Sequence, residues 1–378
     1  MKNSEILNQI LKTLEKEHIN LYHDVSKQEI EDYISKISDI DSLSRFEFEY
    51  EMRKLFAKFK DGHTQYEVPK IALDKKLVFV QGKMYVKDGE TYKEIKSIGG
   101  MDSKEVIKKF AEMQCCETKA YLKDCINEDI NNFVSYIMLK LVNNDFSIDC
   151  VVDNNGQEEK ITLNEVSNEK NIETKKPNYN FEVLDNNVLR INYRECKQQV
   201  GYPFDEFIQD VKNEIESKEI TQFVVDLRGN HGGNSGIIIP LIETLKELKD
   251  KSNIDVVVLI DNGVFSSGRW AVADLKANFD VELIGEPTGG ATVSYGHLMP
   301  LALEVNPNWT IRYTASKKKF DLRERIGFGE HETGSIQPDI YVPKTIQDMQ
   351  ENRDVQLETA LEYLAKQAEL QNDECQPE

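Results

Sequence analysis

The chain has 378 residues and a formal net charge of −20. This length exceeds what a single hydrophobic core usually covers, so we expect two or three domains. The acidic charge, without a cluster of Lys and Arg, argues against nucleic acid as a partner. No run of roughly 18 uncharged apolar residues, which a membrane-spanning helix would need, occurs in the sequence.

The cysteines, the N-terminal residues and the metal-binding motifs indicate in which cellular compartment the protein is expected and which cofactors it needs. The six cysteines are scattered without a CxxC pair, which predicts free thiols in a reducing compartment. The N-terminus reads as an amphipathic helix rather than a signal peptide, so the chain as given is expected in the cytoplasm. An extracytoplasmic protein whose export signal was removed is the alternative. No HExxH or other compact ligand cluster is present, so we predict no metal and no cofactor.

The first region, residues 1–68, is predicted to be an N-terminal helical cap. Apolar residues recur at helical spacing almost throughout residues 1–62, as in Ile6, Ile10 and Leu14. The last helix ends near Gly62, a residue typical of helix ends, and His63 follows on the next loop.

The second region, residues 69–175, changes to short strands and turns. Strands are expected over 75–89 and 91–100, a helix over 103–113, and a hairpin over 146–163 around Asn154-Asn155-Gly156. The polar stretch 164–180 is typical of a linker. These patterns predict a separate strand-rich module.

The third region, residues 176–345, alternates apolar strands with helices. Strands are expected over 188–194, 222–228, 255–261 and 281–286, and helices near 203–217, 237–250 and 266–279. Short, fully apolar strands separated by helices predict βαβ units and a buried, largely parallel sheet. The remainder, 346–378, is predicted to be one helix to about residue 370 and a polar tail. The fold class is therefore α/β.

The loop after the strand at 222–228 contains three glycines within five residues, Gly229, Gly232 and Gly233. In parallel sheets, ligands bind beyond the carboxyl ends of the strands. Glycines there let backbone amides converge on an anion or an oxyanion. A plain flexible turn is the alternative, and a phosphate loop is disfavoured because neither GxxxxGK[ST] nor GxGxxG is present.

The loop after the strand at 255–261 places Ser266 and Ser267 at the start of the next helix. Serines at helix starts usually act as caps. A serine in this position can also be a nucleophile, because the helix dipole and free amides stabilise negative charge at its Oγ. The residues themselves leave both interpretations open.

Four motifs in order resemble one family. DLRGNHGG (226–233), NGVFSSG (262–268), IGEPTGG (284–290) and GSIQPDIYV (334–342) resemble the core of the S41 serine peptidases, the carboxyl-terminal-processing and tricorn-like proteases. LFAKFKDGHT and KEIKSIGGMDSKEV match that family's helical N-terminus and PDZ-like module. The resemblance implies a ClpP/crotonase-like catalytic core, an N-terminal helical cap and a strand-rich PDZ-like module.

The resemblance also implies roles for single residues. Laid on the family's motif, Ser266 is the nucleophile. The lysine base of the processing proteases would fall at Ala291, so the serine–lysine dyad is absent. The branch with a histidine base places that histidine at His63, although Gly62 replaces the serine that precedes it there. His231 and His297 are the competing candidates for the base.

The remaining roles follow from the same resemblance. The oxyanion would be held by the Ser267 N–H and an amide of Gly232 or Gly233. Glu330 or Glu332 would orient His63. The family's glutamate aligns directly with His331, which lies between these two residues.

These residues together predict a serine-type peptidase that cleaves peptides or unfolded protein segments through an acyl-enzyme. A catalytically inactive S41-like protein that binds peptides or a hydrophobic small molecule is the alternative. Acyl-CoA chemistry, which the same fold also supports, is disfavoured because the sequence has no sign of nucleotide recognition. Nothing in the sequence indicates an oligomeric state.

Overall fold

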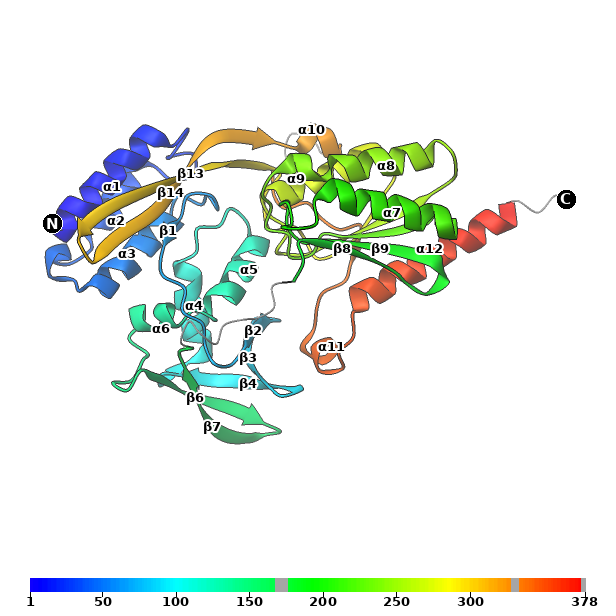
Figure 1. The fold of residues 1–378 in the computed structure, drawn as a ribbon. Helices are drawn as coiled ribbons and strands as arrows, with labels where there is room; N and C mark the ends of the chain where they lie inside the picture. The colour runs from blue at the N-terminus through cyan, green and yellow to red at the C-terminus, as the bar shows by residue number, and fades with distance from the viewer. Residues whose placement is uncertain (167–175, 328–332, 375–378) are drawn as a thin grey trace. The chain divides into compact units, whose positions relative to one another are not determined.

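The computed structural model describes residues 1–166, 176–327 and 333–374, which form two compact units (Figure 1). The first unit contains Met1–Glu173 and Ser294–Phe320, and the second contains Thr174–Val293 and Asp321–Glu378. Residues 294–320, which the predicted division places in the third region, thus cluster with the N-terminal residues.

Three helices begin the first unit: α1 (Asn3–Glu17), α2 (Lys27–Ser35) and α3 (Arg45–Ala57), with a 3₁₀ turn η1 (Ile40–Ser42) between the last two. Ser26 and Ser44 cap α2 and α3 by accepting from backbone N–H groups one turn ahead. The apolar faces of the helices pack on a three-stranded antiparallel sheet of β1 (Tyr66–Glu67), β14 (Trp309–Asp321) and β13 (Val293–Asn306). Figure 1 shows the β13–β14 hairpin beside these helices.

The strand-rich part of the first unit forms a second antiparallel sheet. Its strands are β2 (Leu77–Val80), β3 (Lys83–Asp88), β4 (Thr91–Ile98), β5 (Met101–Asp102), β6 (Ser147–Asn154) and β7 (Gln157–Asn164). Its helices are α4 (Ser103–Glu112), α5 (Lys119–Asp129) and α6 (Phe133–Met138). The predicted hairpin is confirmed, because β6 pairs with β7 across a turn in which Asn155 and Gly156 both have positive φ.

A six-stranded sheet forms the centre of the second unit. Its order is β15 (Ile340–Tyr341), β12 (Glu282–Gly285), β11 (Asp255–Ile260), β10 (Gln222–Asp226), β9 (Val188–Tyr193) and β8 (Tyr179–Val183). All neighbours are parallel except β8 and β9, which are antiparallel. The predicted parallel, buried sheet is therefore confirmed.

Helices cover both faces of this sheet because its strands are apolar on both sides. Phe223 and Val225 pack in the cluster that includes α7 (Phe204–Lys218), α8 (Ile239–Lys249) and α9 (Ser267–Asn278). Val224 faces the opposite way and packs in a cluster with Ala360 of α12 (Val355–Glu374). The short elements are η2 (Asp185–Asn187), η3 (Ser235–Ile238), α10 (Arg323–Ile326) and α11 (Ile346–Gln350).

The C-terminal region differs from its prediction. We expected one helix over 346–370, but α11 ends at Gln350 and α12 begins at Val355. Asn352 has a φ of 53°, a left-handed conformation that an α-helix does not accommodate. The break therefore has a local backbone cause that apolar periodicity does not reveal.

Candidate active site

Two loops meet at the carboxyl edge of the parallel sheet in the second unit. One follows β10 from Arg228 to Asn234, and the other follows β11 from Asp261 to Ser266. Asp261 Oδ1 accepts hydrogen bonds from the N–H groups of Gly229 (2.8 Å) and Gly263 (3.0 Å). One carboxylate oxygen thus fixes both loops where their strands end.

Ser266 has an unusual backbone conformation. Its φ is 49° and its ψ is −121°, a region that residues with a side chain rarely occupy. Such strain costs on the order of 1–3 kcal/mol and persists where the surroundings hold it in place. Ser266 makes no capping hydrogen bond to α9, although it occupies the N-cap position. The helix-cap interpretation therefore does not fit its side chain, and the backbone makes a sharp, strained turn between β11 and α9.

Ser267 is arranged differently from its neighbour. It is the first residue of α9, and its Oγ donates a hydrogen bond to the Gly233 carbonyl at 2.7 Å. Within the described residues, no acceptor lies opposite the Ser267 backbone N–H. The hydroxyl therefore fastens the glycine loop to the helix start, while the amide stays available for a ligand.

The glycine loop approaches both serines closely. Gly232 has a φ of 99°, and a Cβ built on it would lie 2.6 Å from Ser267 N and 2.7 Å from Ser266 Cβ. Its own N–H donates to Asn230 Oδ1 at 2.9 Å. The Gly233 N–H has no acceptor in the part of the chain that the structure describes. Of the two predicted glycine amides, only that of Gly233 is thus free of a competing hydrogen bond.

Asn230 is a positioning residue that the sequence analysis did not single out. It is fully buried, and its Oδ1 accepts from Gly232 while its Nδ2 donates to the Tyr193 carbonyl at 2.7 Å. Its carbonyl accepts from the Phe265 N–H at 2.9 Å, directly before Ser266. Asn230 therefore links the end of β9, the glycine loop and the serine turn. Its position inside the glycine-rich motif was the available signal.

An ionic network holds the start of the glycine loop. Arg228 donates to Asp226 through Nη2 (2.7 Å) and to both oxygens of Asp354 (2.6 and 2.8 Å). Burial alone would raise the pKa of Asp226, but hydrogen bonds and charge from Arg228, then Arg190, lower it to about 2. Asp226 is therefore ionised and anchors the loop to the residues that precede α12.

Ala291 occupies the position where the resemblance would place a lysine, and an arginine is its neighbour. The buried Arg269 donates through Nη1 to the Ala291 carbonyl and through Nε to the Ser266 carbonyl at 3.3 Å. A Cβ on Gly290 would lie 2.4 Å from Arg269 Cδ, so that glycine makes room for the arginine. Arg269 thus supports the backbone of the serine turn from its buried side.

His63 lies in the first unit, on the loop after α3. It is buried, its N–H donates to Asp61 Oδ1 at 3.0 Å, and its carbonyl accepts from Thr314 Oγ1 at 2.6 Å. Gly296 of β13 leaves space beside the ring, because a Cβ there would lie 3.4 Å from His63 Cε1. The loop that carries His63 is therefore fixed by the β13–β14 hairpin.

Asp61 organises this loop through its carboxylate. Asp61 Oδ2 accepts from His18 Nε2 (2.9 Å), Thr64 Oγ1 (2.6 Å) and Ser316 Oγ (2.6 Å). Burial would raise its pKa, but these hydrogen bonds, His18 first, lower the pKa of Asp61 to about 2. The carboxylate is thus stabilised in its charged form.

We expect Asp61→Asn to lower the stability of the folded chain in a pH-dependent way. A carboxyl whose pKa falls from 3.8 to about 2 on folding contributes about 2 kcal/mol above its unfolded pKa. That contribution disappears as the pH falls from about 4 towards about 2, because the wild-type carboxyl then becomes protonated. Urea unfolding at neutral and at acid pH measures it. A deficit of equal size at both pH values would contradict the ionised network.

The other predicted residues are placed as follows. His231 is exposed in the glycine loop, and His297 is exposed in β13 with a φ of 56°. Glu330 and Glu332, with His331 between them, lie outside the described residues. The structure brings Ser266, Ser267, Gly232 and Gly233 together in the second unit. His63 belongs to the first unit, so its pairing with Ser266 stays a prediction.

No cluster of three His, Cys, Asp or Glu side chains that could hold a metal ion occurs among the described residues. In the same part of the chain, none of the helices has the length and apolar character needed to cross a membrane.

Comparisons with known proteins identify the fold. No protein-family model and no curated protein sequence matches the chain. Among solved structures, mature CPAF complexed with lactacystin has a TM-score of 0.65 at 11% identity and covers 98% of both chains. Mature CPAF alone has a TM-score of 0.63 at 11% identity, over 92% of this chain and 94% of that one. A weaker match is the photosystem II D1 C-terminal processing protease (TM-score 0.46, 12% identity, 93% and 97%). The mixed helix-and-sheet fold of this chain thus resembles that of CPAF.

Proposed function

We propose that this protein is a serine peptidase of the S41 type, with Ser266 as the nucleophile and His63 as the general base. The observation that carries the proposal is the strained backbone of Ser266 at the start of α9, against which Gly232 is packed. A helix cap would not need that conformation, whereas an exposed nucleophile on a strand-to-helix turn does. The likeness to CPAF supports the fold that the proposal assumes.

In the proposed reaction, Ser266 Oγ attacks the carbonyl carbon of a peptide bond while His63 takes its proton. The tetrahedral intermediate collapses, the C–N bond breaks, and His63 returns the proton to the leaving amine. Water then hydrolyses the acyl-enzyme ester by the same steps and frees Ser266. A histidine base is favoured because Ala291 cannot accept a proton.

We assign the oxyanion hole to the N–H groups of Ser267 and Gly233. Both amides have no acceptor within the described residues, and the bond from Ser267 Oγ to the Gly233 carbonyl holds the two residues together. The amide of Gly232 is used by Asn230, so Gly232 serves through its lack of a side chain. Glu330 or Glu332 is proposed to orient His63.

The proposed substrates are peptides or unfolded protein segments, guided by the strand-rich module in the manner of a PDZ domain. The ClpP/crotonase-like identity of the core and the cap role of the N-terminal helices belong to the same proposal. The five cysteines among the described residues are free thiols, which fits the cytoplasm as the proposed location.

The test is the appearance of new chain ends in an unfolded protein substrate. Denatured casein is incubated with the wild-type chain or with Ser266→Ala, and the new amino termini are labelled and identified by mass spectrometry. The proposal predicts cleavage by the wild type alone. Equal cleavage by both proteins, or none by either, would reject it.

We expect Gly232→Ala to reduce hydrolysis by on the order of 100-fold or more, because misplacing a catalytic group by about 1 Å has effects of that size. The new Cβ would lie under 3 Å from Ser266 and Ser267, so the loop or the serine turn must move.

Gly229→Ala is the matched control in the same loop. Gly229 also has positive φ (71°), but no atom of the described residues lies within 4 Å of its built Cβ. We expect it to retain activity within about tenfold of the wild type, since it adds only about 1–2 kcal/mol of backbone strain. Peptide hydrolysis rates for both variants decide this, and equal losses would contradict the packing argument.

A further inference from the structure

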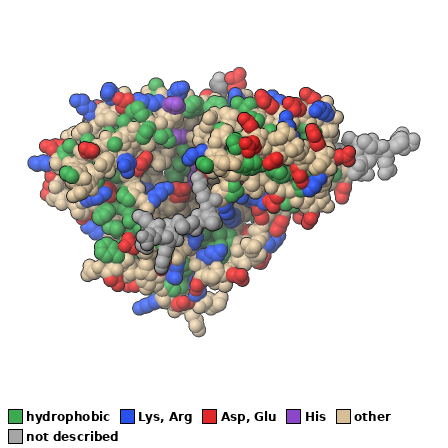
Figure 2. Space-filling view, in the orientation of Figure 1, with side chains coloured by type: hydrophobic (Ala, Val, Ile, Leu, Met, Phe, Trp, Pro, Cys, Tyr) green, Lys and Arg blue, Asp and Glu red, His purple; other side chains and the backbone are tan. Residues whose placement is uncertain are grey.

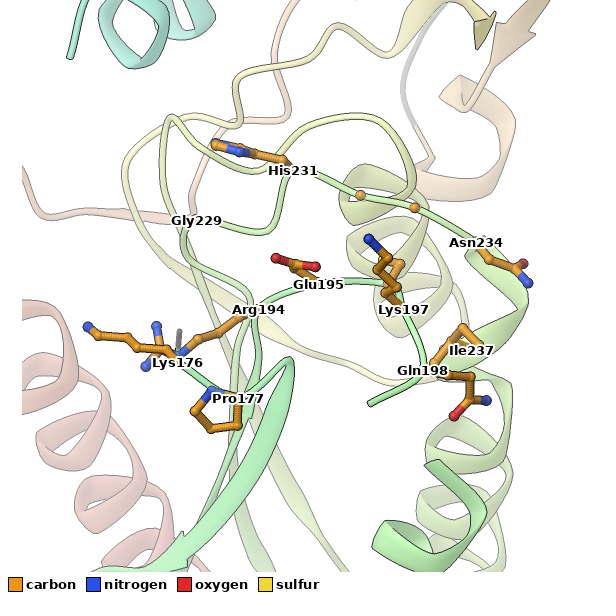
Figure 3. Close-up of a pocket in the computed structure, with 13 residues that line it drawn as sticks. Lys176, Pro177, Arg194, Glu195, Lys197, Gln198, Gly229, His231, Asn234 and Ile237 are labelled. Carbon is orange, nitrogen blue, oxygen red and sulfur yellow. The ribbon is translucent and has the colours of Figure 1, made fainter. Parts of the chain in front are cut away.

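A cavity of about 690 Å³ adjoins the glycine loop in the second unit (Figure 3). The loop lines it with Gly232, Gly233 and Asn234, and the chain after β9 lines the opposite side. Since Gly232 also packs on Ser266, this cavity lies beside the proposed nucleophile. A group bound in it would lie within a few residues of the reacting peptide bond.

Most of the charged side chains around this cavity are cationic. Lys176, Arg194 and Lys197 line it, with the single carboxylate of Glu195 among them. Figure 3 shows Arg194 and Lys197 extending from the same chain segment in different directions around Glu195. The chain has a net charge of −20, and acidic side chains are spread over the face shown in Figure 2. Three cations at one cavity thus contrast with the rest of the protein.

The ion pairing of these three cations differs from that of other arginines in the described chain. Elsewhere, buried or half-buried arginines such as Arg53, Arg190 and Arg228 each form an ion pair. Within residues 1–166, 176–327 and 333–374, none of Lys176, Arg194 and Lys197 is within 4.0 Å of a carboxylate oxygen. Arg194 makes one long hydrogen bond, to Asn192 Oδ1 at 3.4 Å. Its guanidinium is therefore available to an incoming anion.

The backbone that carries Arg194 and Lys197 is fixed to the glycine loop. Between them, the Cys196 N–H donates to the Gly232 carbonyl at 3.0 Å, and the Asn234 N–H donates to the Cys196 carbonyl at 2.7 Å. On the other side, the Arg194 N–H donates to the Asn178 carbonyl at 2.8 Å. The cations thus keep a defined register relative to Gly233 and Ser266.

We infer that this cavity is a substrate subsite that binds a carboxylate of the peptide close to the scissile bond. A guanidinium and two ammonium groups that line one cavity suit a carboxylate, because Arg donates two parallel hydrogen bonds and Lys adds positive charge. The carboxylate comes from an Asp or Glu side chain or from the free carboxyl terminus of the peptide. This inference rests on the proposed peptidase function and specifies its substrates.

The test compares peptides that differ only in one carboxylate. Three matched peptides carry Glu near the cleavage site with an amidated terminus, Gln with an amidated terminus, or Gln with a free carboxyl terminus. For the wild type, we expect kcat/KM to be about tenfold higher for a peptide with the recognised carboxylate than for the uncharged one, a size typical of partly exposed charge pairs. The peptide that shows the increase identifies the source of the carboxylate.

The variants show whether the cations cause this preference. In Arg194→Met/Lys197→Met, the preference should fall to within about twofold, while the uncharged peptide is cleaved at nearly the wild-type rate. In Arg194→Glu/Lys197→Glu, a peptide with Lys in place of Glu should be preferred. Lys246→Met, which removes an exposed lysine of α8, is the matched control and should leave the preference unchanged.

Several results would overturn the inference. They are a wild type without preference, a preference that survives in the double Met variant, or an equal loss for all three peptides. Binding to the Ser266→Ala chain, measured by fluorescence anisotropy, separates this inference from the proposed function. If no peptide is cleaved but the carboxylate peptide still binds tighter through Arg194 and Lys197, the peptidase proposal fails and the subsite stands. If cleavage depends on Ser266 but not on the cations, the subsite fails alone.

Discussion

Replacing Ser266 with alanine is expected to reduce peptide hydrolysis by on the order of 10⁴-fold or more. The substitution removes one side-chain oxygen and adds no atom, so the fold and its unfolding temperature should stay close to those of the wild type. Residual turnover would come from the oxyanion hole and from substrate binding. Initial rates on a fluorogenic peptide, with circular dichroism of both proteins, measure the effect.

Ser267→Ala is the matched control for this prediction. It removes the hydrogen bond from Ser267 Oγ to the Gly233 carbonyl, whose net contribution is about 1 kcal/mol. The backbone N–H of residue 267 remains in place, so the rate should fall by about tenfold or less. If Ser267→Ala abolished hydrolysis and Ser266→Ala did not, the assignment of the two serines would be reversed.

Replacing His63 with alanine is the second substitution expected to have a large effect. Loss of a general base in such a site reduces kcat by on the order of 10⁴-fold. The His63 ring is buried and packed near Gly296, so alanine leaves a cavity of about its size. Imidazole added to the solution should enter that cavity and partly restore hydrolysis. Chemical rescue distinguishes a lost base from a distorted fold, which added imidazole does not repair.

The competing histidines provide the comparison for His63. His231 and His297 are exposed, and we expect His231→Ala and His297→Ala each to retain activity within about tenfold of the wild type. Near-complete loss in either of these, with activity retained in His63→Ala, would identify a different base. Rescue by imidazole in that variant would strengthen this opposite conclusion.

The parallel sheet was predictable because its signal is local. β10 and β11 are short apolar runs that lie between two parallel neighbours, and burial on both faces requires that composition. Their carboxyl ends lie at the same edge, so the glycine loop and the serine turn could be expected to meet. Local patterning thus gave both the sheet and the place of the candidate site.

Non-local pairing and short buried elements were not predictable in this way. β14 pairs with β1 through Tyr313 and Tyr66, which are far apart in the sequence, so residues 294–320 join the N-terminal unit. The six-residue helix α6 is buried on almost every side and therefore lacks an amphipathic period. Sequence periodicity does not contain information on either feature.

The details of the candidate site depend on backbone geometry and on side-chain partners. The sequence predicted a helix that begins with both serines, whereas α9 begins at Ser267 and Ser266 takes a strained conformation before it. Asn230 and Asp261 are ordinary loop residues in the sequence. Their importance arises from hydrogen bonds to other strand ends, which only the folded chain creates.

Mass-spectrometric mapping of the residue that reacts with a fluorophosphonate tests the central claim most directly. The probe phosphonylates an activated serine hydroxyl and loses fluoride, so it marks the nucleophile itself. We predict a single adduct on Ser266 in the wild type and none in Ser266→Ala, while Ser267→Ala is still labelled at Ser266. An adduct on Ser267, or equal labelling of the wild type and Ser266→Ala, would contradict the proposed nucleophile.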